Sequence, residues 1–244
     1  MPSVLNLSAY LFTRIDDPWG LRVALRERAG DAELKGTILL AEEGINLVLA
    51  GDADAVRRFA DDLRRDPRFA ELTTKESWSA VQPFQKMLVK VKREIIRMDH
   101  PTIRPEAGRA PAVGPATLRR WLDQGRDDDG RDVVLVDTRN AFEVDYGRFA
   151  GALEWRIERF TRFPDAAAAH RDDLQGKTVV SYCTGGIRCE KAALYLRAEG
   201  IDAFQLDGGI LGYFEAVGGA HWTGECFVFD GREALRPDLE PIVT

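Results

Sequence analysis

The residue with the clearest capacity for chemistry is Cys183, because it opens a short glycine-rich loop that ends at an arginine. The loop, Cys183-Thr-Gly-Gly-Ile-Arg188, follows the apolar run Val179–Tyr182. Adjacent glycines let successive backbone N–H groups converge on one point, and a following helix presents its positive end there. Together with the charge of Arg188, these effects favour the thiolate, which is the nucleophilic form of cysteine. We predict that Cys183 is the catalytic residue and that its loop consists of Thr184, Gly185, Gly186, Ile187 and Arg188.

Cys183 is compatible with more than one role. A free cysteine at a strand end is often only a small buried apolar side chain. Protein tyrosine phosphatases place five residues between their cysteine and arginine, whereas four residues separate Cys183 from Arg188. The smaller ring suits a sulfur atom better than a phosphate. The spacing therefore counts against phosphatase activity.

The chain contains three cysteines and three histidines. An odd, sparse set of cysteines argues against a disulfide scaffold and for a reducing compartment. Cys183 and Cys189 lie six positions apart rather than three, and the histidines show no paired ligand spacing, so we expect no metal site. Cys189, in the first turn of the expected helix, is either a resolving thiol for Cys183 or inert, and Cys226 is expected in the core.

The elements that must position Cys183 have the rhythm of a parallel sheet, because apolar runs alternate with loops and helical segments. The expected strands are Asp132–Asp137, Lys177–Tyr182 and Ala203–Leu206, and the expected helix is Cys189–Gly200. Asp137 and Arg139 follow a strand end, on the edge where open α/β sheets bind ligands. We expect these two residues to form an ion-pair or hydrogen-bond network that orients the Cys183 loop.

The first half of the chain has a different order of elements. Strands are expected at Val4–Phe12, Leu34–Ala41, Ile45–Ala50, Phe69–Ser77 and Met87–Glu94, and helices at Pro18–Arg28 and from an Asp52 cap to about Arg65. The order β-α-β-β-α-β matches the ferredoxin-like sandwich. Prolines and glycines interrupt any regular pattern between about Met98 and Pro115, as a linker would. Pro115 suits the first turn of a helix through Leu122.

Bulk properties place few limits on function. The chain has 244 residues and a formal net charge of −6, which does not indicate a nucleic-acid binder, although a local basic patch matters more than the total. No run approaches the ~20 apolar residues of a membrane span. The start lacks the basic region and apolar run of a secretory signal. We expect a cytoplasmic protein that does not bind membranes, and the sequence carries no indication of its oligomeric state.

Several motifs together resemble a known family. The order of Asp137-Thr-Arg139, Glu143, Gly147–Ala152, the Cys183 loop and Leu206-Asp-Gly-Gly209 resembles that of the rhodanese, or sulfurtransferase, domain. Four segments are more narrowly similar to the bacterial tRNA uridine hydroxylases, which contain such a domain. They are Gly36–Asn46, Asp137–Glu143, Cys183–Lys191 and Trp222–Asp230. The resemblance runs over nearly the whole chain.

The resemblance implies a fold class and an activity. The fold would be α/β, with a ferredoxin-like α+β sandwich followed by a rhodanese-type domain with a parallel sheet. The expected divisions are 1–97 (ferredoxin-like, RNA-binding), 98–114 (linker), 115–230 (rhodanese, with the cysteine loop) and 231–244 (C-terminal tail). The activity would be oxygen-dependent hydroxylation at C5 of the wobble uridine of tRNA, giving 5-hydroxyuridine. Cys183 occupies the position that forms a persulfide in rhodanese domains, and no bound metal or flavin is implied.

A tRNA substrate requires a basic surface, and one segment offers it. Seven basic residues stand against three acidic ones from Lys75 to Arg104, with Trp78 and Phe84 nearby for base stacking. The candidate RNA-binding residues are Lys86, Lys90, Lys92 and Arg93. The alternative is a solvated strand face. An anticodon loop would supply the unpaired base that such chemistry needs.

Three hypotheses stay open at this point. The first is a tRNA hydroxylase centred on Cys183, and the second is a sulfurtransferase that carries a Cys183 persulfide. The third is a non-catalytic RNA-binding protein that merely retains the fold, which the intact loop argues against. Glu43 and Asn46 flank a Gly44 turn, and they either face the RNA or the Cys183 cleft or serve only the turn.

Overall fold

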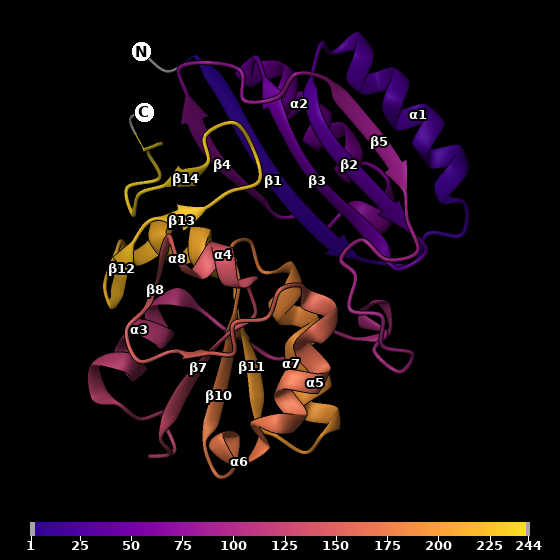
Figure 1. Ribbon diagram of the computed structural model, residues 1–244. Helices are drawn as coiled ribbons and strands as arrows, with labels where there is room; N and C mark the ends of the chain where they lie inside the picture. Colours follow the sequence, from indigo (N-terminus) through magenta and orange to yellow (C-terminus); the bar gives the residue numbers. More distant parts are fainter. Residues whose placement is uncertain (1–2, 243–244) are drawn as a thin grey trace. The chain divides into compact units, whose positions relative to one another are not determined.

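The computed structural model describes residues 3–242, which divide into two units (Figure 1). Unit 1 contains the described residues up to Arg97 together with Phe229–Glu233, and unit 2 contains Met98–Val228 and Ala234–Ile242. The expected C-terminal tail, 231–244, is therefore not a separate segment within the described range. The residues up to Glu233 belong to unit 1, where the Gly231 N–H donates to the Pro83 carbonyl. The residues from Ala234 onward belong to unit 2, where Ala234 and Leu235 pair with Phe227 and Cys226.

Unit 1 is a five-stranded sheet in the order β4-β1-β3-β2-β5. Its elements are β1 (Val4–Phe12), α1 (Pro18–Asp31), β2 (Lys35–Ala41), β3 (Gly44–Gly51), α2 (Ala53–Arg64), the 3-10 helix η1 (Pro67–Phe69), β4 (Thr74–Ser79) and β5 (Met87–Val91). The pairs of β1 with β3 and β4, and of β2 with β3, are antiparallel, whereas β5 lies parallel to β2. This arrangement confirms the ferredoxin-like sandwich and adds an edge strand to it.

The core of unit 1 follows from the alternation of apolar residues along its strands. Leu5, Leu7 and Ala9 of β1 are buried, as are Ile45, Leu47 and Leu49 of β3. The helix α2 adds Val56, Phe59, Ala60 and Leu63. Asp52 caps α2 by accepting a hydrogen bond from the Ala55 N–H at 3.0 Å.

One strand of unit 1 begins later than the sequence predicts. The expected strand Phe69–Ser77 starts at Thr74, because Pro67–Phe69 form a short 3-10 helix. Asp66 caps this helix by accepting from the Arg68 N–H at 3.0 Å, and Phe69 is fully buried in the core. The apolar residue at position 69 therefore packs from a turn rather than from a strand.

Unit 2 contains a five-stranded sheet in the order β6-β11-β10-β7-β9, in which every pairing is parallel. The strands of this sheet are β6 (Ala112–Val113), β7 (Val133–Asp137), β9 (Leu153–Glu154), β10 (Thr178–Tyr182) and β11 (Ala203–Leu206). Two further pairs of strands in unit 2 are β8 (Gly147–Phe149) with β12 (Trp222–Gly224), and β13 (Cys226–Phe227) with β14 (Ala234–Leu235). Its helices are η2 (Pro105–Ala107), α3 (Pro115–Gln124), α4 (Ala141–Val144), η3 (Phe160–Arg162), α5 (Phe163–Ala169), α6 (Arg171–Leu174), α7 (Ile187–Ala198) and α8 (Gly209–Val217). The predicted parallel sheet is confirmed, but the segment expected as a linker contributes β6 to its edge.

Helices cover both faces of the unit 2 sheet (Figure 1). On one face, α3 and α8 pack over Val180 and Tyr182 of the central strand β10. On the other face, α7 lies against β10 and β11, and Ser181 donates a hydrogen bond to the Cys189 carbonyl of that helix at 2.9 Å. All five residues of β10 are buried, as expected for a strand covered on both faces. No helix within residues 3–242 has the length and apolar character needed to span a membrane.

Candidate active site

Cys183 lies at the carboxyl end of the central strand of unit 2. It follows Tyr182, the last residue of β10, and is fully buried. The helix α7 begins at Ile187, two residues before the predicted start, so Arg188 and Cys189 both lie in its first turn. The Gly186 N–H donates a hydrogen bond to Cys183 Sγ at 3.2 Å. The loop therefore directs a backbone donor and the start of a helix at the sulfur atom, as the sequence predicts.

Backbone N–H groups in the first turn of α8 bind the Cys183 loop. The Ile210 N–H donates to the Cys183 carbonyl at 2.9 Å, and the Leu211 N–H donates to the Thr184 carbonyl at 3.0 Å. Gly209 has a φ of +64°, and a Cβ atom there would stand 2.5 Å from the Cys183 carbonyl oxygen. A side chain at this position is thus excluded by both conformation and space. Gly209 was not among the predicted site residues, although the Gly-Gly pair after β11 carries the signal.

Arg188 is engaged in a buried ion pair. Its two terminal nitrogens, Nη1 and Nη2, donate to Glu143 Oε2 and Oε1 at 2.6 and 2.7 Å, and both side chains are almost completely buried. The carboxylate of Glu143 raises the pKa of Arg188 further above its ordinary value, against the opposing effect of burial. Arg188 is therefore a permanent cation, as the sequence predicts, and Glu143 is the carboxylate that pairs with it beside the Cys183 loop.

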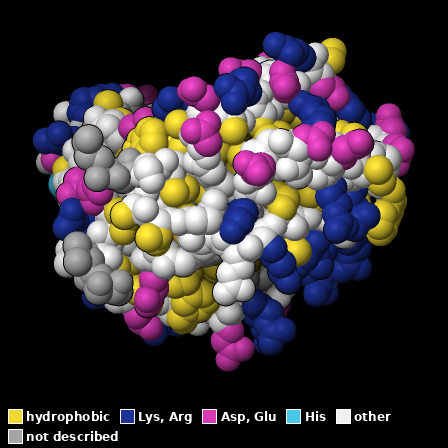
Figure 2. All heavy atoms as spheres, turned by 90° about the horizontal axis from the view of Figure 1, so that it is seen from above, with side chains coloured by type: hydrophobic (Ala, Val, Ile, Leu, Met, Phe, Trp, Pro, Cys, Tyr) yellow, Lys and Arg dark blue, Asp and Glu magenta, His cyan; other side chains and the backbone are white. Residues whose placement is uncertain are grey.

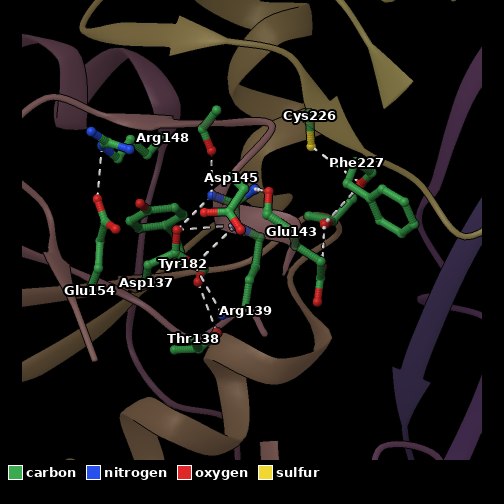
Figure 3. A network of polar contacts seen from close by, with 12 residues as sticks. Asp137, Thr138, Arg139, Glu143, Asp145, Arg148, Glu154, Tyr182, Cys226 and Phe227 are labelled. Carbon is green, nitrogen blue, oxygen red and sulfur yellow. Dashed lines mark hydrogen bonds and ion pairs between the residues drawn. The ribbon is translucent and has the colours of Figure 1, made fainter. Parts of the chain in front are cut away.

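Asp137 and Arg139 form a second buried ion pair (Figure 3). Arg139 Nη2 and Nε donate to Asp137 at 2.6 and 3.0 Å, and both side chains are fully buried. Arg139 also donates to the backbone carbonyls of Glu143 at 3.2 Å and Gly147 at 2.7 Å. The expected ion pair is thus present, and it fixes the backbone of the residue whose carboxylate holds Arg188.

The surroundings of Cys183 stabilise its thiolate. Burial opposes ionisation, but a hydrogen bond from Cys189, the charge of Arg188 and the nearby backbone N–H groups outweigh it and lower the pKa of Cys183 to about 5. Burial and the adjacent Cys183 charge raise the pKa of Cys189, so this second thiol keeps its proton. In the structure Cys189 Sγ lies 3.0 Å from the Gly186 carbonyl oxygen. Its single hydrogen can serve either that carbonyl or the Cys183 thiolate.

Cys226 lies beside the same network, which the sequence did not indicate. It is buried in the core of unit 2, as expected. Burial raises the pKa of Cys226 to about 12, although the charge of Arg139 and a hydrogen bond with Thr184 act in the opposite direction. Thr184 Oγ1 in turn lies 3.5 Å from Glu143 Oε1 and 3.4 Å from the Phe227 carbonyl (Figure 3 shows Glu143, Cys226 and Phe227 in one group). The Cys226 thiol therefore remains protonated and lies beside Thr184 of the Cys183 loop.

The remaining candidate residues lie in unit 1. Lys86, Lys90, Lys92 and Arg93 are exposed on and beside β5. Glu43 Oε1 accepts a hydrogen bond from the Ile95 N–H at 2.7 Å, and Asn46 Nδ2 donates to the Ile95 carbonyl at 3.4 Å. Both side chains thus hold the backbone of Ile95, and a role toward RNA stays a prediction. Within residues 3–242, no group of three histidine, cysteine, aspartate or glutamate residues is arranged to hold a metal ion.

Comparison with known proteins identifies the family. A protein of Variovorax paradoxus named tRNA uridine(34) hydroxylase is 67% identical over 240 residues, which cover 98% of this chain and 91% of the relative. Proteins of the same name from Delftia acidovorans and Bordetella petrii are 63% and 61% identical, over 98% and 99% of this chain and 91% and 96% of those proteins. The chain belongs to the tRNA uridine(34) hydroxylase family. It is therefore a member of an enzyme family, as the resemblance implied.

Two domain families match successive parts of this member of the tRNA uridine(34) hydroxylase family. The UPF0176 acylphosphatase like domain matches residues 4–95, which lie in unit 1. The rhodanese-like domain matches residues 116–216, which lie in unit 2 and include the whole Cys183 loop. The rhodanese-type fold expected for the second half of the hydroxylase-family chain is thus confirmed, and Cys183 lies within it.

Proposed function

We propose that this protein hydroxylates C5 of uridine 34 in the anticodon loop of tRNA, with Cys183 as the reacting residue and molecular oxygen as co-substrate. The observation that carries the proposal is the buried Cys183 in surroundings that favour its thiolate, in a chain 67% identical to a tRNA uridine(34) hydroxylase. A tRNA substrate implies the cytoplasm. No resident metal or flavin is part of the proposal.

A thiolate offers a route to hydroxylation through C6 of the uracil ring. Its lone pair forms an S–C6 bond, and the C5–C6 π electrons move into the adjacent carbonyl, which leaves C5 an enolate carbon. C5 then bonds to oxygen and, after protonation, carries a hydroperoxide. A pair of small-molecule thiols reduces this group to a hydroxyl, and releases water and a disulfide. Loss of the C5 proton and departure of the thiolate restore the double bond.

The loop suits both the attack and the departure of sulfur. Cys183 must leave C6 as an anion, and the Gly186 N–H and the start of α7 stabilise that anion. Cys183 is fully buried, so its loop must open before a uracil ring can contact the sulfur atom. That ring must also be unstacked and turned out of the anticodon loop. Cys189 keeps its thiol proton and can turn it from the Gly186 carbonyl toward the anion.

Nucleoside mass spectrometry tests this function directly. Cells that lack the protein would be complemented with the wild-type chain or with Cys183→Ser, and their tRNA digested. We expect 5-hydroxyuridine and its derivatives only with the wild type. Purified protein incubated with unmodified tRNA and ¹⁸O₂ should place one heavy oxygen atom in the product. Product formed by Cys183→Ser would exclude Cys183 as the reacting residue.

Sulfur transfer is a second candidate that the same loop favours. The Cys183 thiolate would attack thiosulfate to form a persulfide and release sulfite, and the loop N–H groups would hold the terminal sulfur anion. Cyanide would then accept that sulfur as thiocyanate. Thiocyanate formation by the wild type without any change in tRNA would make sulfur transfer the function.

A further inference from the structure

A group of cations in unit 1 lacks acidic partners. Most arginines of the molecule are paired, as Arg57 with Glu76 and Arg156 with Asp145 illustrate. Five basic residues on or near β5 instead make no ion pair with any other residue in the described range. They are Arg26, Lys35, Lys86, Lys90 and Lys92.

Lys86, Lys90 and Lys92 alternate with the buried Val89, so their side chains leave β5 on its exposed face, beside the free edge of the sheet. β5 is an edge strand that pairs only with β2. The Lys86 carbonyl accepts from the Gly36 N–H and the Lys92 N–H donates to the Leu40 carbonyl, so these alternate residues turn their backbones toward β2. The Val89 carbonyl points the other way, and Arg22 Nε of α1 donates to it at 3.0 Å. The helix α1 therefore borders the open edge of β5.

The exposed flank of α1 continues this border. Arg28 lies toward α2, with its guanidinium 5.6 Å from the Phe59 ring centroid and 4.0 Å from Asp62. Arg22 points to the opposite side, toward β5, and Arg26 follows it one turn later. Trp19 lies three residues before Arg22 on the same flank and is 64% exposed.

We call this surface the α1–β5 edge, and it consists of Trp19, Arg26, Lys35, Lys86, Lys90 and Lys92. Figure 2 shows Lys and Arg side chains gathered on the right, the side on which Figure 1 draws α1 and β5. Lys90 and Lys92 point to one side of the strand about 7 Å apart. Lys35 precedes Gly36, which pairs with Met87, and so it neighbours Lys86 across the strands. Like charges at such positions repel unless an anion lies between them.

The chemistry of this edge matches that of single-stranded nucleic acid. A row of unneutralised cations attracts phosphates, and an exposed indole ring offers a face on which a base can stack. We propose that the α1–β5 edge binds the ribose-phosphate backbone of the tRNA and that an unpaired base stacks on Trp19. The inference rests on the proposed function only in its choice of tRNA as the nucleic acid.

Two helix positions provide a matched test of the electrostatic part. Arg26 of α1 and Arg58 of α2 are both exposed and without an ion pair in the described range, so Arg26→Glu and Arg58→Glu change the net charge equally. Binding of fluorescently labelled tRNA would be measured by anisotropy over a series of KCl concentrations. We expect Arg26→Glu to weaken binding about tenfold more than Arg58→Glu. Equal losses would mean that only net charge matters, and would overturn the inference.

Further variants separate phosphate contacts from stacking. Lys90→Ala with Lys92→Ala should reduce the slope of log K against log salt by about 1.4, since each single-strand phosphate contact contributes about 0.7. Trp19→Ala should weaken binding about tenfold at every salt concentration, with an unchanged slope, and Trp19→Phe should restore most of the loss. A Trp19→Ala variant that binds like the wild type would exclude stacking.

The same proteins distinguish failure of this inference from failure of the proposed function. If wild-type protein binds tRNA through the α1–β5 edge but forms no 5-hydroxyuridine, the proposed function fails and the edge stands. If hydroxylation occurs and all edge variants bind like the wild type, the edge is excluded and the function stands. Absorbance of the Cys183 thiolate, unchanged in the edge variants, would show that unit 2 is intact.

Discussion

The guanidinium of Arg188 and the carboxylate of Glu143 face each other through two parallel hydrogen bonds of 2.6 and 2.7 Å, shielded from water. Glu143 lies in the short helix α4, yet it anchors the first turn of the helix that follows Cys183. The position of the Cys183 loop thus depends on a carboxylate 40 residues before that cysteine.

Removing one member of this ion pair should lower the stability of the folded protein. Glu143→Ala leaves a buried arginine without its partner, so we expect the free energy of unfolding to fall by about 3–5 kcal/mol. Urea denaturation followed by circular dichroism measures it. Arg148→Ala, which removes a partly exposed ion pair with Glu154, is the control and should cost no more than about 1 kcal/mol. Similar losses in the two variants would contradict the structural role of Glu143.

The ionisation of Cys183 should be visible by spectroscopy. Since its pKa lies at about 5 rather than near 9, the thiolate is present above pH 5 and is lost as the pH falls through that value. Absorbance at 240 nm should show a step near pH 5 in the wild type that is missing from Cys183→Ser. Because the pKa is depressed on folding, this group stabilises the protein fully above pH 9, and that contribution disappears as the pH falls toward 5. A step at pH 8–9 would contradict the prediction.

Cys189 should control that step by donating a hydrogen bond. Cys189→Ala removes the donor and should raise the pKa of Cys183, whereas Cys189→Ser keeps an O–H and should largely preserve it. The pH dependence of thiolate absorbance in the two variants measures the difference. Equal shifts would indicate that only the volume of residue 189 matters.

Gly209 should tolerate no side chain. In Gly209→Ala the new Cβ would meet the Cys183 carbonyl at 2.5 Å and the Gly186 nitrogen at 2.6 Å, so the loop must move. We expect at least a hundredfold loss of 5-hydroxyuridine formation. Gly125→Ala is the matched control, because Gly125 also has a positive φ, +70°, but its Cβ would meet nothing within 4 Å. That change should cost about 1 kcal/mol of stability and leave activity intact. Comparable activity of the two variants would show that the contact with Gly209 is unimportant.

Much of the site could be predicted from local patterns. The strand before Cys183 is a near-continuous apolar run, and the glycines and arginine after it have a recognisable spacing. Both the loop and its place at a strand end therefore followed from the sequence. The bounds predicted for Val4–Phe12 and Ala203–Leu206 agree with the structure for the same reason.

The remainder depends on contacts between distant residues. Nothing local distinguishes Glu143 as the partner of Arg188, since the pairing requires the folded order of β7 and β10. The two-residue strand β6 is too short to show an alternation of apolar and polar residues in the sequence. It is a strand only because it forms hydrogen bonds with β11. The prediction for Phe69 was wrong because an apolar residue in a 3-10 turn has the same signature as one in a strand.

The place of the segment Phe229–Glu233 in unit 1 limits when that unit can finish folding during synthesis. It belongs to unit 1, where the Gly231 N–H donates to the Pro83 carbonyl at 3.1 Å and Arg232 donates to the Ser77 hydroxyl at 2.6 Å. During synthesis on a ribosome, unit 1 therefore lacks these bonds until residue 233 has emerged, after all but the last strand of unit 2 has been made. The two units acquire their final form together, although one precedes the other almost entirely in the sequence.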